Sequence, residues 1–317
     1  MTTTRSLVRV GAGVAALATV AATTSTVSAH SRYRTARQEP TAIRVNTEYA
    51  TDVAPDSPTI TLTLTDKTIK GLPATLAPGW HKLVLIDKTK DGRDFDVIKV
   101  HAGAAYTAAE FEKDVAKSTS QNPKTSVGAV LDIIKNAQAE GGVTAVRSYA
   151  ATHRSMFVNL QAGRSYFFDN SSDNQGKENA TLVTVSGAPT TLAAPKATAT
   201  IATREYGFNT VHVKAGTHLT KFTSIGSEVH IIVGFKVPAG TTVDDVTKAL
   251  ESDGPPPFPA QQVLNVSPMS HGGSFVSALT LAKGTYAFVC FMPELHAGPQ
   301  QGAPHFLEGM VKVFDVS

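Results

Sequence analysis

The last part of the chain gathers side chains whose chemistry suits a metal ion. The stretch YAFVCFMPELHAGPQQGAPHFLEGM, residues 286–310, contains the only cysteine, Cys290. It is followed by His296, His305 and Met310. Thiolate, imidazole and thioether groups together are typical copper ligands. Because a lone cysteine has no partner within its chain, Cys290 is a buried inert thiol, half of an intermolecular disulfide or a metal ligand.

The N-terminus predicts export from the cytoplasm. Arg5 and Arg9 precede the apolar run VGAGVAALATVAA, and VSA at residues 27–29 fits a small-residue cleavage site. We therefore expect a signal peptide over residues 1–29 and a protein that is secreted or extracytoplasmic, in the cell envelope. The apolar run is short for a membrane span, and no later segment could form one. Secreted proteins usually pair their cysteines, which makes the single thiol conspicuous.

Composition indicates a globular chain that does not bind nucleic acid. The 317 residues are 42% hydrophobic and 17% charged, with a formal net charge of +3. The expected signal peptide carries two arginines and no other charged residue, so the mature charge is +3 − 2 = +1. A nearly neutral protein gives no argument for a nucleic-acid partner.

Apolar and polar residues alternate in several short runs, which predicts a β protein. The clearest strand and strand–turn candidates are residues 59–72, 79–89, 94–103 and 155–170. Helical spacing predicts one helix over residues 107–118, with Thr107 as its N-cap and Glu110 three residues on. A second helix is expected from residue 127, ending at Gly141.

The order of these elements repeats along the chain. Residues 212–250 match residues 75–115, each giving a strand, a glycine turn, a second strand, a turn and a short helix. We therefore expect an all-β fold of two tandem Greek-key β-sandwiches, each with a short inserted helix. The expected boundaries are a signal peptide over 1–29, a flexible leader over 30–40, a first domain over 41–187, a linker over 188–200 and a second domain over 201–317.

The two copies differ at the positions that bear on metal binding. His230 follows SIGSEV and opens an apolar run that predicts a strand. In our alignment Asp96 of the first copy matches His230, and Asn170 matches Cys290. Polar residues in the first copy favour strand-end positions near solvent over positions in a core. The first copy therefore lacks the candidate ligands of the second.

A copper site of one kind combines two imidazoles and one thiolate in a trigonal arrangement with a weak axial methionine. One histidine comes from an early strand, and the other ligands come from one late loop. The runs GTYAFVC, PHFLEGM and MVKVFDV resemble the cupredoxins, the plastocyanin-like blue copper family, over residues 206–317. The resemblance implies one copper ion in the second domain and one-electron transfer. It implies four ligands: His230, Cys290, His305 and Met310.

One feature departs from the family pattern. Fourteen residues separate Cys290 from His305, whereas this loop is much shorter in small blue copper proteins. The added length leaves His296 and Met292 as alternative ligands and is expected to loosen the loop.

The sequence argues against an enzyme. Multicopper oxidases need paired H-x-H motifs, and the chain has none. Val289 precedes Cys290 and Phe291 follows it, so the His-Cys bridge of two-domain nitrite reductases is missing. Two alternative functions remain. The protein carries or buffers Cu(I) without electron transfer, or it is a metal-free structural or binding module with the same fold. A redox or copper-handling partner protein is expected, and the sequence does not identify it.

Overall fold

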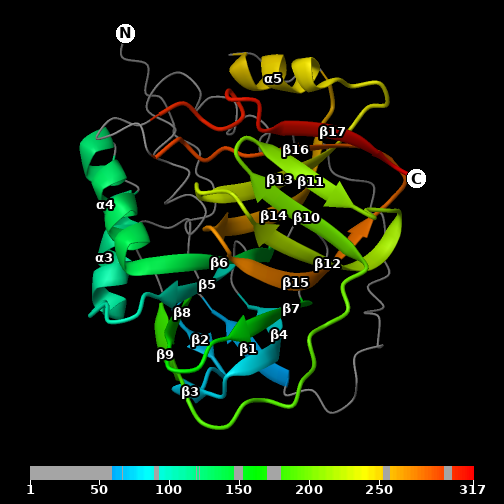
Figure 1. Ribbon diagram of the computed structural model, residues 1–317. Helices are drawn as coiled ribbons and strands as arrows, with labels where there is room; N and C mark the ends of the chain where they lie inside the picture. Colours follow the sequence, from blue (N-terminus) through cyan, green and yellow to red (C-terminus); the bar gives the residue numbers. More distant parts are fainter. Residues whose placement is uncertain are drawn as a thin grey trace.

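The structure is a computed structural model, and it describes residues 59–65, 67–88, 93–118, 120, 122–145, 153–169, 180–252, 258–295 and 302–317 (Figure 1). The expected signal peptide and leader lie outside these residues. Among the residues described, no helix has the length and apolar character needed to cross a membrane.

The first half of the described chain is built from short strands and two helices. Its elements are β1 (Thr59–Leu64), β2 (Ile69–Lys70), β3 (Thr75–Leu76), β4 (Gly79–Asp87), β5 (Arg93–Val100), α3 (Ala108–Ser118), α4 (Pro123–Asn136), β6 (Ala137–Ala145), β7 (His153–Leu160), β8 (Ser165–Asp169) and β9 (Thr181–Val185).

The second half follows a similar order with one helix. Its elements are β10 (Ala199–Arg204), β11 (Gly207–Val211), β12 (Gly216–Ser224), β13 (His230–Val237), α5 (Val243–Glu251), β14 (Gln261–Met269), β15 (Ser274–Leu281), β16 (Gly284–Val289) and β17 (Val311–Val316). The last two residues of the segment expected to be a linker, Ala199 and Thr200, therefore begin β10.

Two mixed sheets run through both halves. One has the strand order β11-β10-β12-β15-β7-β4-β1-β2, and the other β17-β16-β13-β14-β6-β5-β8-β9-β3. The halves join where β15 pairs with β7 and β14 pairs with β6, both antiparallel. A hydrophobic core of buried residues is continuous from Leu83 in β4 to Val316 in β17. The all-β sandwich architecture expected from the sequence is confirmed, and β13, β16 and β17, which flank the candidate ligands, belong to the larger sheet.

The helices agree with the sequence in part. Helix α3 begins after Thr107, whose hydroxyl accepts from the N–H of Glu110 at 3.2 Å while the Glu110 carboxylate accepts from the N–H of Thr107 at 2.9 Å. Helix α4 ends at Asn136, and the residues up to Gly141 lie in β6, so the expected helix end was wrong. Residues 137–141 pair with β5 instead of continuing the helix. Gly141 also has a φ of +103°, which a right-handed helix does not contain.

Strand register corrects the comparison between the two halves. Asp96 in β5 lies opposite Asp169, the last residue of β8. Val233 in β13 lies opposite Val289, the last residue of β16. Matching Asn170 with Cys290 also matches Asp169 with Val289, and strand pairing then matches Asp96 with Val233. The match of Asp96 with His230 is therefore three residues out of register with the match of Asn170 with Cys290.

Candidate metal centre

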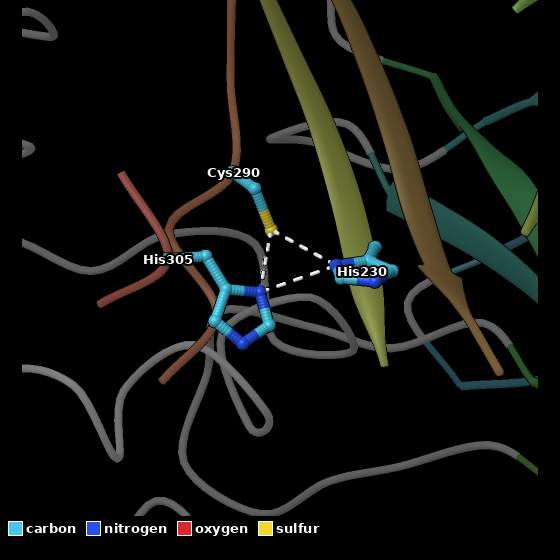
Figure 2. Close-up of side chains that lie close together, drawn as sticks. All are labelled: His230, Cys290 and His305. Atoms are coloured by element: carbon cyan, nitrogen blue, oxygen red, sulfur yellow. Dashed lines mark hydrogen bonds between the residues drawn. The ribbon is translucent and has the colours of Figure 1, made fainter. Parts of the chain in front are cut away.

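Three side chains from separate parts of the second half converge on one point (Figure 2). His230 is the first residue of β13, Cys290 directly follows β16, and His305 lies in the loop that leads to β17. Nδ1 of His230 lies 3.2 Å from Nδ1 of His305. The Cys290 Sγ lies 4.0 Å from the first of these nitrogens and 3.5 Å from the second. Within the described ranges, no other group of three His, Cys, Asp or Glu side chains converges in this way.

Main-chain hydrogen bonds fix this convergence. The N–H of Cys290 donates to the carbonyl of Met310 at 3.2 Å, and the N–H of Met310 donates to the carbonyl of His305 at 2.9 Å. The N–H of His305 donates to the carbonyl of Met292 at 2.7 Å. The strand end that carries the thiol and the loop that carries the imidazole are therefore held together by backbone, independently of any metal.

The long segment between the thiol and the second imidazole is closed at its base. Pro293 and Pro304 form an antiparallel bridge. The N–H of Glu294 donates to the carbonyl of Ala303 at 3.0 Å, and the N–H of Gly302 donates to the carbonyl of Glu294 at 3.1 Å. These bonds bring the two ends of the insertion together. The added length therefore does not separate Cys290 from His305, contrary to the loosening expected from the sequence.

The spacing of the three donor atoms fits a metal ion. Atoms separated by 3.2, 3.5 and 4.0 Å have one point in their plane equidistant from all three, the centre of their circumscribed circle, at about 2.1 Å from each. That centre lies inside the triangle because all its angles are acute. Zinc, for comparison, lies at about 2.0–2.1 Å from imidazole nitrogen and about 2.3 Å from thiolate sulfur. Two imidazoles and one thiolate in a trigonal set are the donors of a blue copper site, whereas structural zinc sites take four ligands.

Burial shapes the protonation of the donors. His230, Cys290 and His305 are all 0% exposed, so the expectation that the first two lie near solvent was wrong. Burial lowers the pKa of His230 to about 4, against the opposing effect of Glu205. Burial and the neighbouring His230 lower the pKa of His305 to about 3. Both imidazoles are therefore neutral at pH 7, which is the form that binds a metal ion.

The thiol is likewise neutral in the metal-free protein. Burial raises the pKa of Cys290 to about 12, and backbone hydrogen bonds from Ile231 and Met292 oppose this only in part. The thiol must lose its proton when a metal ion binds. The site thus exchanges one buried proton for one cation, which keeps the change in buried charge small.

Two side chains that the sequence did not single out contact the imidazoles. Oε1 of Glu205 lies 3.5 Å from Nε2 of His230, and the ring of Tyr206 meets the ring of His305 edge-on at 5.0 Å between centroids. Partial burial disfavours ionisation of Glu205, but backbone N–H groups, chiefly that of Glu228, outweigh it and hold the pKa of this carboxyl below its usual range. No motif marks Glu205 in the sequence, since it lies twenty-five residues before His230.

The other candidate ligands have different outcomes. Met310 is fully buried next to the site and contacts Cys290 and His305 through its main chain. Met292 is also fully buried, and its carbonyl accepts from His305. His296 lies outside the described residues. The structure thus brings together three of the four expected donor side chains and places the backbone of the fourth beside them.

Solved structures similar to this chain include auracyanins and a copper nitrite reductase. Reduced auracyanin from Roseiflexus castenholzii is 25% identical, over 37% of this chain and 94% of that chain, with a TM-score of 0.24. Auracyanin B is 17% identical, over 39% of this chain and 93% of that chain, with a TM-score of 0.23. Copper nitrite reductase from Nitrosomonas europaea is 13% identical, over 82% and 94% of the two chains, with a TM-score of 0.21.

No protein-family model matches the chain, and no curated protein matches it. Because TM-scores below 0.5 do not carry an argument, the assignment depends on the strands and donor atoms of this chain itself. A buried His-Cys-His triangle of metal-binding size, set beside strand ends of a β-sandwich, fits a copper site of cupredoxin type.

Proposed function

We propose that the protein is an extracytoplasmic one-electron carrier with a type 1 copper site in its second half. The proposed ligands are Nδ1 of His230, Nδ1 of His305, the thiolate of Cys290 and, as the weak axial ligand, the thioether of Met310. The observation that carries the proposal is the donor triangle with its centre about 2.1 Å from each atom. Copper in such a site alternates between Cu(II) and Cu(I).

Preorganisation of the ligands supports electron transfer as the function. The strand pairing of β13, β16 and β17 and the backbone bonds around Cys290 and His305 fix the donors before metal arrives. A fixed ligand set limits the rearrangement between the two copper oxidation states. All three donor side chains are 0% exposed, which disfavours the rapid metal exchange that a Cu(I) carrier needs.

Met310 is proposed as axial ligand because the backbone holds it next to two other ligands. Its carbonyl accepts from Cys290 and its N–H donates to His305, and its side chain is 0% exposed. Met292 and His296 are the competing donors. Substituting Met310, Met292 and His296 one at a time shows which of them is the axial ligand. Loss of the axial ligand changes the reduction potential of the copper while the three trigonal donors remain.

The experiment that tests the proposal is Cu(II) loading of the purified metal-free protein. We expect one copper per chain and an intense thiolate-to-copper absorption that gives a blue colour. Cys290→Ser abolishes the colour, and His230→Ala or His305→Ala weakens Cu(II) binding. A wild-type protein that binds stoichiometric Cu(II) without colour contradicts a type 1 site, and tight Cu(I) binding with weak Cu(II) binding indicates metal carriage instead.

Binding also stabilises the native state, which gives a test that does not depend on colour. At free copper 100 times the dissociation constant, the free energy of unfolding should rise by about 2.7 kcal/mol. Cys290→Ser should show no such rise. If excess copper leaves the unfolding of the wild type unchanged, the native state does not bind copper and the chain is a metal-free module of the same fold.

Export and the non-enzymatic role are part of the same proposal. The N-terminal pattern supports cleavage after Ala29, which the mass of the mature protein would reveal. The absence of paired H-x-H motifs and of a His-Cys pair in the sequence supports the non-enzymatic role. The first half is proposed to support the site through the shared sheets and to dock the redox partner.

A further inference from the structure

A two-residue turn reaches both imidazoles of the metal centre. Arg204 pairs with Gly207 across the β10–β11 hairpin, so Glu205 and Tyr206 form its tip. The ring of Tyr206 lies edge-on to His305, with 60° between the ring planes. The carboxylate of Glu205 approaches the imidazole of His230, with Oε1 3.5 Å from Nε2. The same turn therefore contacts both histidines of the metal centre, His230 through Glu205 and His305 through Tyr206.

The carboxylate of Glu205 is oriented by hydrogen bonds. Its Oε1 accepts from the N–H of Glu228 at 2.6 Å and from the hydroxyl of Ser227 at 3.3 Å. The same oxygen lies 3.5 Å from Nε2 of His230. Its position is thus set by the segment that leads into β13, and not by the imidazole alone.

The residue at position 226 leaves room for this contact. A Cβ at Gly226 would lie 2.5 Å from Oε1 of Glu205 and 2.7 Å from Nε2 of His230. Any side chain there would enter the space between carboxylate and imidazole. The bend at Gly226 therefore allows the two groups to approach one another.

Nε2 of His230 is buried, and no atom in the described part of the chain lies at both the distance and the angle of a hydrogen bond to it. Glu205 Oε1, at 3.5 Å, is the acceptor placed to receive its proton. Hydrogen bonds at functional sites are often long in the absence of the bound group. With the ring proton on Nε2, the lone pair of Nδ1 is free to face Cys290 and His305.

We propose that Glu205 is a positioning residue of the metal centre: its carboxylate holds the proton of His230 on Nε2, so that Nδ1 is the ligand atom, and its negative charge favours Cu(II) over Cu(I). The choice of copper as the metal rests on the proposed function, whereas the tautomer does not. Metal-bound histidines commonly donate their second N–H to a carboxylate or carbonyl, and losing that partner typically weakens metal binding 10- to 100-fold.

The first test uses metal-free protein, so that it stays independent of copper. Nitrogen-15 NMR of labelled histidine should show His230 with its proton on Nε2 in the wild type and in Glu205→Gln, whose amide oxygen still accepts a hydrogen bond. Glu205→Ala should lose this tautomer or mix it with the other. The same tautomer in Glu205→Ala, with the native chemical-shift pattern otherwise kept, overturns the proposal even if the protein proves to be a blue copper protein.

The second test compares two variants that remove the same charge near the site. Glu205→Gln should reduce the ratio of Cu(II) to Cu(I) affinity about tenfold, which corresponds to a rise of about 59 mV in reduction potential for one electron. Glu308→Gln is the matched control, because Glu308 lies three residues after His305 in the same loop and its side chain is exposed to solvent. Its effect should be less than about threefold. Equal shifts in both variants would overturn the direct role of Glu205 and indicate a general field effect.

Discussion

The glycine beside the metal centre offers a direct measure of how tightly the site is packed. In Gly226→Ala the new Cβ would lie 2.5 Å from Glu205 Oε1 and 2.7 Å from His230 Nε2. Real Cβ contacts are not shorter than 3.0 Å, so the first atom must move by at least 0.5 Å and the second by at least 0.3 Å. Neither moves freely, since the N–H of Glu228 holds the carboxylate at 2.6 Å and the imidazole is fully buried.

Inserting one methyl group into a packed interior costs about 1–3 kcal/mol. We therefore expect metal-free Gly226→Ala to lose about 1–3 kcal/mol of unfolding free energy. Cu(II) affinity should also fall, because His230 is displaced within the donor triangle. Gly207→Ala is the control: the nearest atom to its added Cβ is Nε of Arg204 at 3.8 Å, an ordinary contact. This variant should change stability by less than about 0.5 kcal/mol.

Urea unfolding of the metal-free proteins measures the difference, provided that the m-values agree. Competition with a copper chelator then gives Cu(II) affinity. If Gly226→Ala is as stable as Gly207→Ala and binds Cu(II) as tightly as the wild type, the packing argument at this position is wrong.

Three further predictions concern other parts of the molecule. Gly128→Ala in α4 should stabilise the protein by about 0.5–1 kcal/mol in thermal or urea unfolding, because nothing lies within 4 Å of the added Cβ and alanine is the better helix former; a loss of stability would contradict this. The Cys290 thiol, buried and with its pKa raised to about 12, should react with a disulfide reagent many times more slowly in native metal-free protein than in urea, and equal rates would refute its burial. Hydrogen bonds from the side chain and N–H of Thr242 lower the pKa of Asp245 in the α5 capping box. Asp245→Asn should therefore be less stable than the wild type near neutral pH, and this difference should disappear as the pH falls through the lowered pKa. A difference in unfolding free energy that persists unchanged at pH 2 would count against the capping role.

Three donors were predictable because the resemblance to the cupredoxins names a histidine at an early strand, a cysteine at a late strand and a histidine in the loop after it. His230 opens the apolar run of β13, Cys290 closes that of β16, and His305 precedes β17 by a short segment. Such strand ends meet at one end of a β-sandwich. The sequence could therefore indicate which residues meet, although it did not indicate that they are completely buried.

The features that escaped the sequence depend on contacts between distant segments. Glu205 approaches His230 only because the β10–β11 turn and the bend at Gly226 come together in space. The end of α4 was placed too late because residues 137–141 continue the helix spacing, and pairing with β5 decides their conformation. Register between strands likewise decided that Asp96 of the first half matches Val233 and not His230. Local patterns contain none of this information.

The insertion between Cys290 and His305 shows how a metal site tolerates a long ligand loop. Loop length affects a site only if the ends of the loop are free to separate. Here the Pro293–Pro304 bridge and the paired bonds between Glu294 and residues 302–303 close the insertion at its base. The bond from His305 to the Met292 carbonyl then fixes the imidazole beside the thiol. The segment from Pro304 to β17 is therefore held in the way a short ligand loop would be, because the two ends of the insertion are bonded to each other.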